Sequence, residues 1–117
     1  MSSTPTIYHN PRCSKSRASL AILEQHDTDP EIVEYLKTPP TEEQLTKLLA
    51  MLELAPRELM RTGQSEYKEL NLANSALSDQ ELIKTMVAHP ILIERPIVVH
   101  NGKAVIGRPP ENVLDIL

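Results

Sequence analysis

The strand-like runs of this chain lie near its two ends and helix-compatible sequence fills the middle, an order that restricts the folds open to it. Residues 5–9 (PTIYH) are β-rich and bounded by turn formers, and residues 31–36 (EIVEYL) read as a second strand. Between them, residues from Ser14 to about His26 are helix-compatible, with an apolar face at 20–23. Two parallel strands joined through a helix form a β-α-β unit.

The end of the chain predicts a β-hairpin. Strand-like residues 96–100 (PIVVH) and 104–107 (AVIG) flank Asn101-Gly102, a dipeptide typical of tight two-residue turns. Residues 110–117 then predict a short terminal helix.

The middle of the chain predicts a series of helices. Thr41, with Gln44 three residues later, forms a capping-box pattern, and the leucines that follow it recur at helical spacing. Pro56 begins a short helix, and a polar linker follows at 62–71 (TGQSEYKELN). Ser78 and Glu81 form the capping pattern of a further helix, which Pro90 ends.

A β-α-β half followed by a β-β-α half is the layout of the thioredoxin fold, here with extra helices between the halves. We therefore predict an α/β protein with a thioredoxin-like, glutaredoxin-like mixed sheet. The 117 residues suit one domain, 1–117, with a helical insertion at about 41–90. Aliphatic residues must form its core, because the chain has no Phe or Trp.

Cys13 is the only cysteine and stands where the first strand passes into the first helix. The first N–H groups of a helix favour an anion, so a thiolate there should have a lowered pKa. Arg12 and Arg17 flank it, and Lys15 lies in the same turn. The alternative is an inert, buried cysteine, but the polar and basic neighbours favour a reactive one.

A lone cysteine cannot form an internal disulfide, which is typical of a reducing compartment. Ser16 occupies the position where a Cys-x-x-Cys dithiol carries its second sulfur. An adduct on Cys13 would therefore need a thiol from another molecule for its release. Glutathione or a glutaredoxin is the natural donor in the cytosol.

Three arginines, Arg61, Arg95 and Arg108, stand at the ends of elements, and arginine suits tetrahedral oxyanions because its planar fork donates paired hydrogen bonds. The alternative for each is a solvated surface charge. Pro96 opens the third strand, where a thioredoxin-like fold usually holds a cis-proline facing the active cysteine.

The role of His9 has two interpretations. His9 could assist deprotonation of the thiol or orient a substrate, or it could be a hydrogen-bonded histidine at a strand end. The other histidines, His26, His89 and His100, show no metal-ligand spacing with Cys13, so we predict no metal. We also expect no bound cofactor.

The net charge and the hydropathy of the chain argue against nucleic acid and membrane as partners. The net charge of −4 argues against a broad nucleic-acid surface. The first ten residues lack a secretory pattern, and no apolar run approaches the ~20 residues that span a bilayer. We expect a cytoplasmic monomer that binds neither nucleic acid nor membrane.

The chain resembles the glutaredoxin-linked arsenate reductase family throughout its length. The matching stretches, in order, are IYHNPRCSKSR, EYLKTPPTEEQL, PRELMRTGQSEY, HPILIERPIVV and GRPPENVLDIL. The resemblance implies a reductase of arsenic detoxification that converts arsenate to arsenite with glutathione as co-substrate and glutaredoxin as partner. It implies Cys13 as the nucleophile and Arg61, Arg95 and Arg108 as oxyanion ligands.

The resemblance also implies roles for the neighbours of the cysteine. His9 and Asn10 match residues thought to tune the thiolate. Ser16 and Arg17 match the positions of the first helix beside the cysteine, and we expect them to bind the oxyanion substrate. The CSKS loop lacks the glycine of well-characterised members, and those members continue beyond the position of Leu117. These differences suggest a paralogous branch.

Two other functions stay open from the sequence. The first is a non-enzymatic thiol redox sensor that binds a protein partner. The second is a reductase of another oxidised small molecule.

Overall fold

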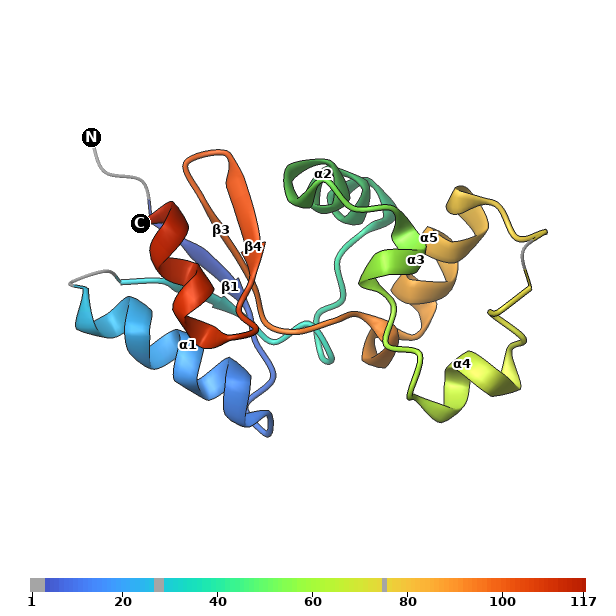
Figure 1. Cartoon of the computed structure of the whole chain (residues 1–117), viewed down its shortest axis with the longest axis horizontal. Helices are drawn as coiled ribbons and strands as arrows, with labels where there is room; N and C mark the ends of the chain where they lie inside the picture. The colour runs from blue at the N-terminus through green and yellow to red at the C-terminus, as the bar shows by residue number, and fades with distance from the viewer. Residues whose placement is uncertain (1–3, 27–28, 75) are drawn as a thin grey trace. The chain divides into compact units, whose positions relative to one another are not determined.

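Four short strands from the two ends of the chain form one mixed sheet (Figure 1). They are β1 (Thr6–Tyr8), β2 (Glu31–Val33), β3 (Ile97–His100) and β4 (Lys103–Ile106), in the order β2-β1-β3-β4. β1 pairs with β2 in parallel, whereas the β1–β3 and β3–β4 pairs are antiparallel. The predicted thioredoxin-like α/β fold with a mixed sheet is confirmed.

The structure, a computed structural model, describes residues 4–26, 29–74 and 76–117. The chain divides into two compact units. The sheet unit comprises Met1–Thr38 and Arg95–Leu117, and the helical unit comprises Pro39–Glu94.

An aliphatic core lies between the sheet and two helices of the sheet unit. Ile7 of β1 stands opposite Val98 of β3 in the sheet register, and both are fully buried. Leu23 from α1 (Ser14–Gln25) packs on them together with Val113 and Ile116 of the terminal helix η2. Figure 1 shows α1 in blue and η2 in red side by side.

The β-β-α layout predicts an α-helix at the end of the chain, but the terminal helix is of another type. η2 (Pro110–Ile116) is a 3₁₀ helix, with Asn112 N–H donating to the Pro109 carbonyl oxygen at 3.0 Å. Its buried residues are Pro110, Val113 and Ile116, a spacing of three. That spacing suits the three residues per turn of a 3₁₀ helix, so this form keeps all three on the core face.

The second strand is shorter than predicted. β2 ends at Val33, and the predicted extension to residue 36 is wrong. The N–H groups of Lys37 and Thr38 both donate to the Glu34 carbonyl oxygen at 2.9 Å, so a turn replaces the strand. This turn keeps Glu34 and Lys37 near the end of β2.

The predicted hairpin turn is confirmed. Asn101 and Gly102 join β3 to β4 with φ of 54° and 76°. Positive φ at both positions is the requirement of a type I′ turn, which explains the Asn-Gly pair.

In the described part of the helical unit, residues 39–74 and 76–94, the helices are α2 (Glu42–Leu52), α3 (Pro56–Leu59), α4 (Ser65–Glu69), α5 (Asp79–Ala88) and the 3₁₀ turn η1 (Pro90–Leu92). The capping box of α2 is confirmed, because Thr41 Oγ1 accepts from Gln44 N–H at 3.1 Å and Thr41 N–H donates to Gln44 Oε1 at 2.9 Å. Ser78 Oγ likewise accepts from Glu81 N–H at 3.2 Å and caps α5.

Helix α4 lies in the segment that was predicted to be a polar linker. It buries none of its residues, so no apolar stripe marks it in the sequence. None of the helices in the described part of the chain is long and apolar enough to cross a bilayer.

Candidate active site

The candidate functional residues of the sheet unit lie at one edge of the sheet. β1 and β2 are parallel, so residues 9–13 and residues 34–37 follow them at the same edge. β3 runs antiparallel to β1 and begins there after Arg95, and β4 ends there before Arg108. The topology therefore brings together four segments that are far apart in the sequence.

A β-turn over residues 10–13 delivers Cys13 to the start of α1. Cys13 N–H donates to the Asn10 carbonyl oxygen at 3.0 Å, and Arg12 N–H donates to Asn10 Oδ1 at 3.0 Å. Asn in the first and Pro in the second position are favoured in such turns, because the amide caps the turn and the ring presets φ. The sequence NPRC thus explains both the turn and the position of the thiol.

Cys13 is the N-cap residue of α1, with φ −94° and ψ 123°. From this position a side chain can accept from the N–H groups of the second and third helical residues, here Lys15 and Ser16. A guanidinium completes the surroundings: Arg108 Nη2 lies 3.7 Å from Cys13 Sγ, while Arg108 Nε donates to the Arg95 carbonyl oxygen at 2.8 Å. The Nε bond holds the guanidinium beside the sulfur.

Opposing influences act on the pKa of Cys13, and the net result is a lowered value. Burial is the largest influence and raises the pKa, because the residue is only 7% exposed. The backbone N–H groups of Ser16 and Lys15 and the charges of Arg95 and Arg108 lower the pKa and together outweigh burial. The predicted reactive thiolate is therefore compatible with a buried sulfur.

The cations that act on Cys13 differ from those that the sequence placed beside it. The side chains of Arg12, Lys15 and Arg17 are exposed. Arg17 Nη1 donates to the Pro11 carbonyl oxygen at 3.0 Å and so braces the turn. The charges that lower the pKa of the thiol belong to Arg95 and Arg108.

His9 and Ser16 form a buried hydrogen-bonded pair. His9 Nδ1 and Ser16 Oγ are 2.6 Å apart, and Asn10 N–H donates to the same oxygen at 3.0 Å. The pKa of His9 is lowered, mainly by burial and also by Arg17, although Glu34 opposes the shift. The pair ties the end of β1 to the first turn of α1. The hydroxyl of Ser16 is thus engaged within the protein.

The peptide bond between Arg95 and Pro96 is cis, as predicted, and the bond between Arg108 and Pro109 is cis as well. Gly107 lies between these prolines and donates its N–H to the Pro96 carbonyl oxygen at 2.9 Å. A Cβ on Gly107 would overlap Ser19 Oγ and lie 2.9 Å from Pro96 Cγ. Glycine therefore permits the close approach that brings Arg108 to Arg95.

Arg61 belongs to the helical unit. A bridge between Met60 and Ile93 positions it, and Arg61 N–H donates to the Leu92 carbonyl oxygen at 2.7 Å. Its Nε lies 4.0 Å from Glu94 Oε1. With the Gln64 amide oxygen turned towards the guanidinium, both Nη atoms lie 2.9 Å from that oxygen. Its predicted role as an oxyanion ligand stays a prediction.

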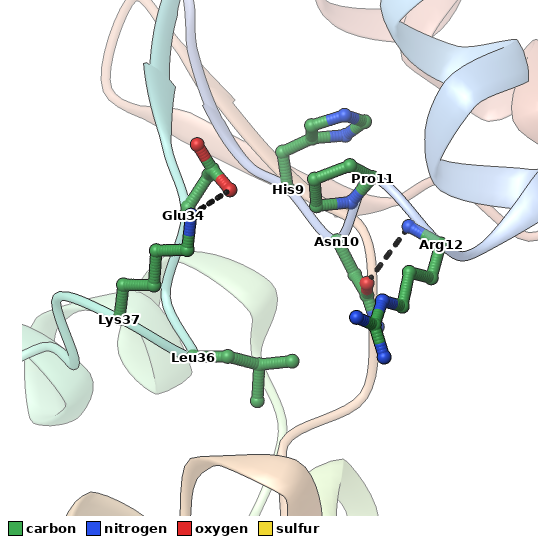
Figure 2. Close-up of a pocket in the computed structure, with 7 residues that line it drawn as sticks. All are labelled: His9, Asn10, Pro11, Arg12, Glu34, Leu36 and Lys37. Atoms are coloured by element: carbon green, nitrogen blue, oxygen red, sulfur yellow. Dashed lines mark hydrogen bonds and ion pairs between the residues drawn. The ribbon is translucent and has the colours of Figure 1, made fainter.

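A cavity of about 270 Å³ opens beside the 10–13 turn (Figure 2). Figure 2 shows Glu34, Leu36 and Lys37 on one wall, facing Pro11, Asn10 and Arg12 on the other. Lys37 Nζ lies 3.6 Å from Glu34 Oε1. Sequence reasoning missed this cavity, although the β-α-β prediction places the end of β2 beside the end of β1.

Among the residues that the structure describes, no group of three or more His, Cys, Asp or Glu side chains could hold a metal ion.

The ArsC family model matches residues 8–116. A curated relative, "Uncharacterized protein YfgD" of Escherichia coli K12, is 57% identical over 95% of this chain and 94% of its own length. An "Arsenate reductase" of Neisseria meningitidis serogroup A is 48% identical, over 95% of this chain and 96% of its own length. A solved structure titled "Arsenate reductase from Vibrio cholerae" is 52% identical, covers 100% of both chains and superposes with a TM-score of 0.97.

These likenesses extend over nearly the whole chain and include the turn, the cysteine and the arginine segments described above. The chain belongs to the ArsC family.

Proposed function

We propose that the protein is an arsenate reductase in which the Cys13 thiolate attacks arsenic. One observation carries this proposal: the sulfur has a lowered pKa and lies 3.7 Å from a guanidinium nitrogen of Arg108. A nucleophile beside an oxyanion ligand is the arrangement that attack on a tetrahedral oxyanion needs. Relatives at 48% identity that carry the name arsenate reductase support the substrate.

The reaction begins with two condensations. The Cys13 thiolate forms a bond to arsenic(V), one arsenic–oxygen bond breaks, and the oxygen leaves as water after protonation. The thiolate of glutathione then bonds to the same arsenic and displaces a second oxygen as water. Arsenic remains in its +5 state through both steps.

Reduction follows when a glutaredoxin thiolate attacks the glutathione sulfur. The arsenic–glutathione bond breaks, its electron pair stays on arsenic, and a glutaredoxin–glutathione disulfide forms. Water then releases arsenite from Cys13 and regenerates the thiol. In total, arsenate and two thiols give arsenite, one disulfide and one water.

The residues of the sheet edge take distinct roles in this proposal. Arg95 and Arg108 bind the oxyanion and stabilise negative charge on its oxygens, an effect of several kcal/mol in such sites. Their charges also lower the pKa of Cys13. Arg61 remains a proposed third ligand, from the family resemblance. Arg17 remains a proposed substrate-side residue on the same ground.

The turn before Cys13 is held by hydrogen bonds among His9, Asn10 and Ser16. Asn10 forms the turn, and the Ser16 hydroxyl joins Asn10 to His9. We propose that this group fixes the N–H groups of the first turn of α1 against the sulfur. Ser16 then serves the oxyanion site mainly through its backbone N–H and its hold on the turn.

The source of electrons is proposed from the thiol count. The chain has a single cysteine, so the disulfide of the reaction must form on other molecules. Glutathione and glutaredoxin in a reducing cytoplasm fit that need. Pro96 is proposed as a structural residue of the site, and residues 41–90 as an insertion in one thioredoxin-like domain.

The test is arsenate-dependent NADPH oxidation in an assay coupled through glutathione reductase, with glutathione and glutaredoxin present. We expect turnover by the wild type and none by Cys13→Ser. Equal NADPH oxidation by the two proteins would refute the proposal.

A further inference from the structure

We propose that the cavity beside the 10–13 turn binds the thiol co-substrate, a small thiol with two carboxylates and one ammonium group, the chemical class of glutathione. The inference rests on the proposed function in one respect, the need for a second thiol at Cys13. It adds a site made by Arg12, Glu34 and Lys37, none of which the thiolate chemistry uses.

The charges that line the cavity complement such a ligand. Arg12 stands on one wall, and Lys37 and Glu34 stand on the other (Figure 2). Two cations and one anion match two carboxylates and one ammonium. The Lys37–Glu34 pair is 3.6 Å long, with side chains 78% and 42% exposed. An exposed pair of this kind is weak, so a ligand can exchange its partners at little cost.

The place of the cavity in the sheet keeps the two substrates apart. The cavity lies between the segments that follow β1 and β2, whereas Arg95 and Arg108 adjoin β3 and β4 on the other side of β1. Cys13 follows the cavity wall directly in the chain and is in contact with Arg108. The carboxylates of a thiol in the cavity would therefore not compete with the oxyanion for its arginines.

The size and lining of the cavity suit a small ligand. Its volume of about 270 Å³ lies just below the range of small-molecule sites, ~300–1,000 Å³. Pro11 and Leu36 supply apolar surface for the methylene groups of a peptide-like thiol, and Leu36 is 43% exposed. The site is thus charged at its walls and apolar between them.

The first experiment measures binding without turnover. S-methylglutathione, which cannot react, is titrated into Cys13→Ser protein while backbone amide shifts are followed by NMR. We expect the largest shifts at residues 10, 12 and 34–37. Arg12→Glu and Lys37→Glu should each weaken binding about fivefold, the effect of losing one exposed charge contact. Lys103→Glu, the same charge change on β4, is the matched control.

The second experiment uses the charge of the thiol. Arsenite formation is measured directly, with excess reduced glutaredoxin and either glutathione or mercaptoethanol as the only small thiol, and the kcat/KM for glutathione is compared with that for mercaptoethanol, which is uncharged. Arg12→Glu and Lys37→Glu should lower the glutathione value about fivefold relative to the mercaptoethanol value. A change in Cys13 reactivity would instead lower both values in proportion.

The inference is overturned if S-methylglutathione does not bind, if its shifts centre on Arg95 and Arg108, or if Lys103→Glu weakens binding as much as Lys37→Glu. Failure of the proposed function has a different signature, because no thiol would then support arsenate turnover by the wild type. The NMR titration gives its answer in either case.

Discussion

Single residues decide how the pKa of Cys13 is lowered. Burial opposes ionisation, and two kinds of group reverse that effect. The N–H groups of Lys15 and Ser16 are local and follow from the N-cap position of the cysteine. Arg108 is 95 residues away in sequence and reaches the sulfur through the fold. The causes of the lowered pKa at this residue are therefore part local and part tertiary.

Removing the distant cation should raise the pKa of the thiol. For Arg108→Ala we expect a higher pKa than in the wild type, because the guanidinium lowers it from 3.7 Å. The pH dependence of the alkylation rate with iodoacetamide measures both values. Lys15→Ala removes a cation that is nearer in sequence but exposed, and should shift the pKa less. A larger shift for Lys15→Ala would contradict this assignment of charges.

The lowered pKa of Cys13 also predicts a pH dependence of stability. A thiol whose pKa is lower in the folded state stabilises the fold above the unfolded pKa of about 8.5. That contribution is lost as the pH falls through the folded-state pKa. The free energy of unfolding, measured in urea, should therefore rise with pH in the wild type relative to Cys13→Ser across this window. A constant difference between the two proteins would show that the pKa is not lowered.

Helices, strands and turns hold the site through specific termini and close contacts. The 10–13 turn ends on the N-cap of α1, and the end of β4 approaches α1 only because residue 107 is glycine. In the helical unit, a capping box starts α2 and Ser78 caps α5. The α2 cap and Gly107 can each be tested by making the same substitution at that residue and at a control residue of the same type.

Loss of the α2 cap should measurably lower the free energy of unfolding. Thr41→Ala removes the acceptor of Gln44 N–H and should lower the free energy of unfolding by about 1 kcal/mol. Thr46→Ala, the same change within α2, removes only a bond from its hydroxyl to the Glu42 carbonyl oxygen at 2.8 Å. It should be neutral or slightly stabilising, because alanine favours helix interiors. Urea denaturation of both variants checks this, and an equal loss from the two would argue against the cap.

Gly107 should not accept a side chain. In Gly107→Ala the new Cβ would meet Ser19 and Pro96, and overpacking of this kind costs about 1–3 kcal/mol. Gly63→Ala is the control, because a Cβ at Gly63 would meet no atom within 4 Å. Thermal and urea denaturation should separate the two variants clearly. Similar stabilities would mean that the contact at residue 107 relaxes without cost.

At the scale of the whole molecule, the residues proposed to act in the reaction are divided between the two units. The sheet unit holds Cys13, Arg95 and Arg108, and the helical unit holds Arg61. Within the helical unit, Arg61 is held by Gln64 and Glu94, whereas Arg57 donates to the Leu72 and Asn74 carbonyl oxygens at 2.6 and 3.0 Å. Arg61, a proposed oxyanion ligand, can thus be compared with Arg57, which links two segments of the same unit by hydrogen bonds.

Replacement of Arg61 should affect activity, whereas replacement of Arg57 should affect stability. Arg61→Ala should lower kcat/KM for arsenate at least about tenfold, the effect of losing one charge-assisted hydrogen bond. Arg57→Ala should lower the melting temperature and leave kcat/KM within about twofold of the wild type, because a folded-state clamp acts on stability. Steady-state kinetics and thermal denaturation distinguish the two, and unchanged kcat/KM in Arg61→Ala would remove it from the oxyanion ligands.

Much of the fold and part of the site could be predicted from the chain. The Asn101-Gly102 turn, the Thr41 and Ser78 caps and Cys13 at the start of a helix depend on hydrogen bonds between neighbours within about four residues, so local sequence contains the needed information. Helix α4 was missed because it buries none of its residues. The family resemblance, carried by motifs along the whole chain, supplied the arginines.

The sequence by itself determined that a single thiol would stand at a helix start with no partner cysteine in the chain, because those are properties of neighbouring residues and of residue counts. Only the tertiary structure decided that Arg95 and Arg108, rather than Arg12 and Arg17, act on the sulfur, and that Glu34 and Lys37 face Arg12 across a cavity. The physical reason is that strand order and the close packing at Gly107 set these distances, and both depend on residues far apart in the chain.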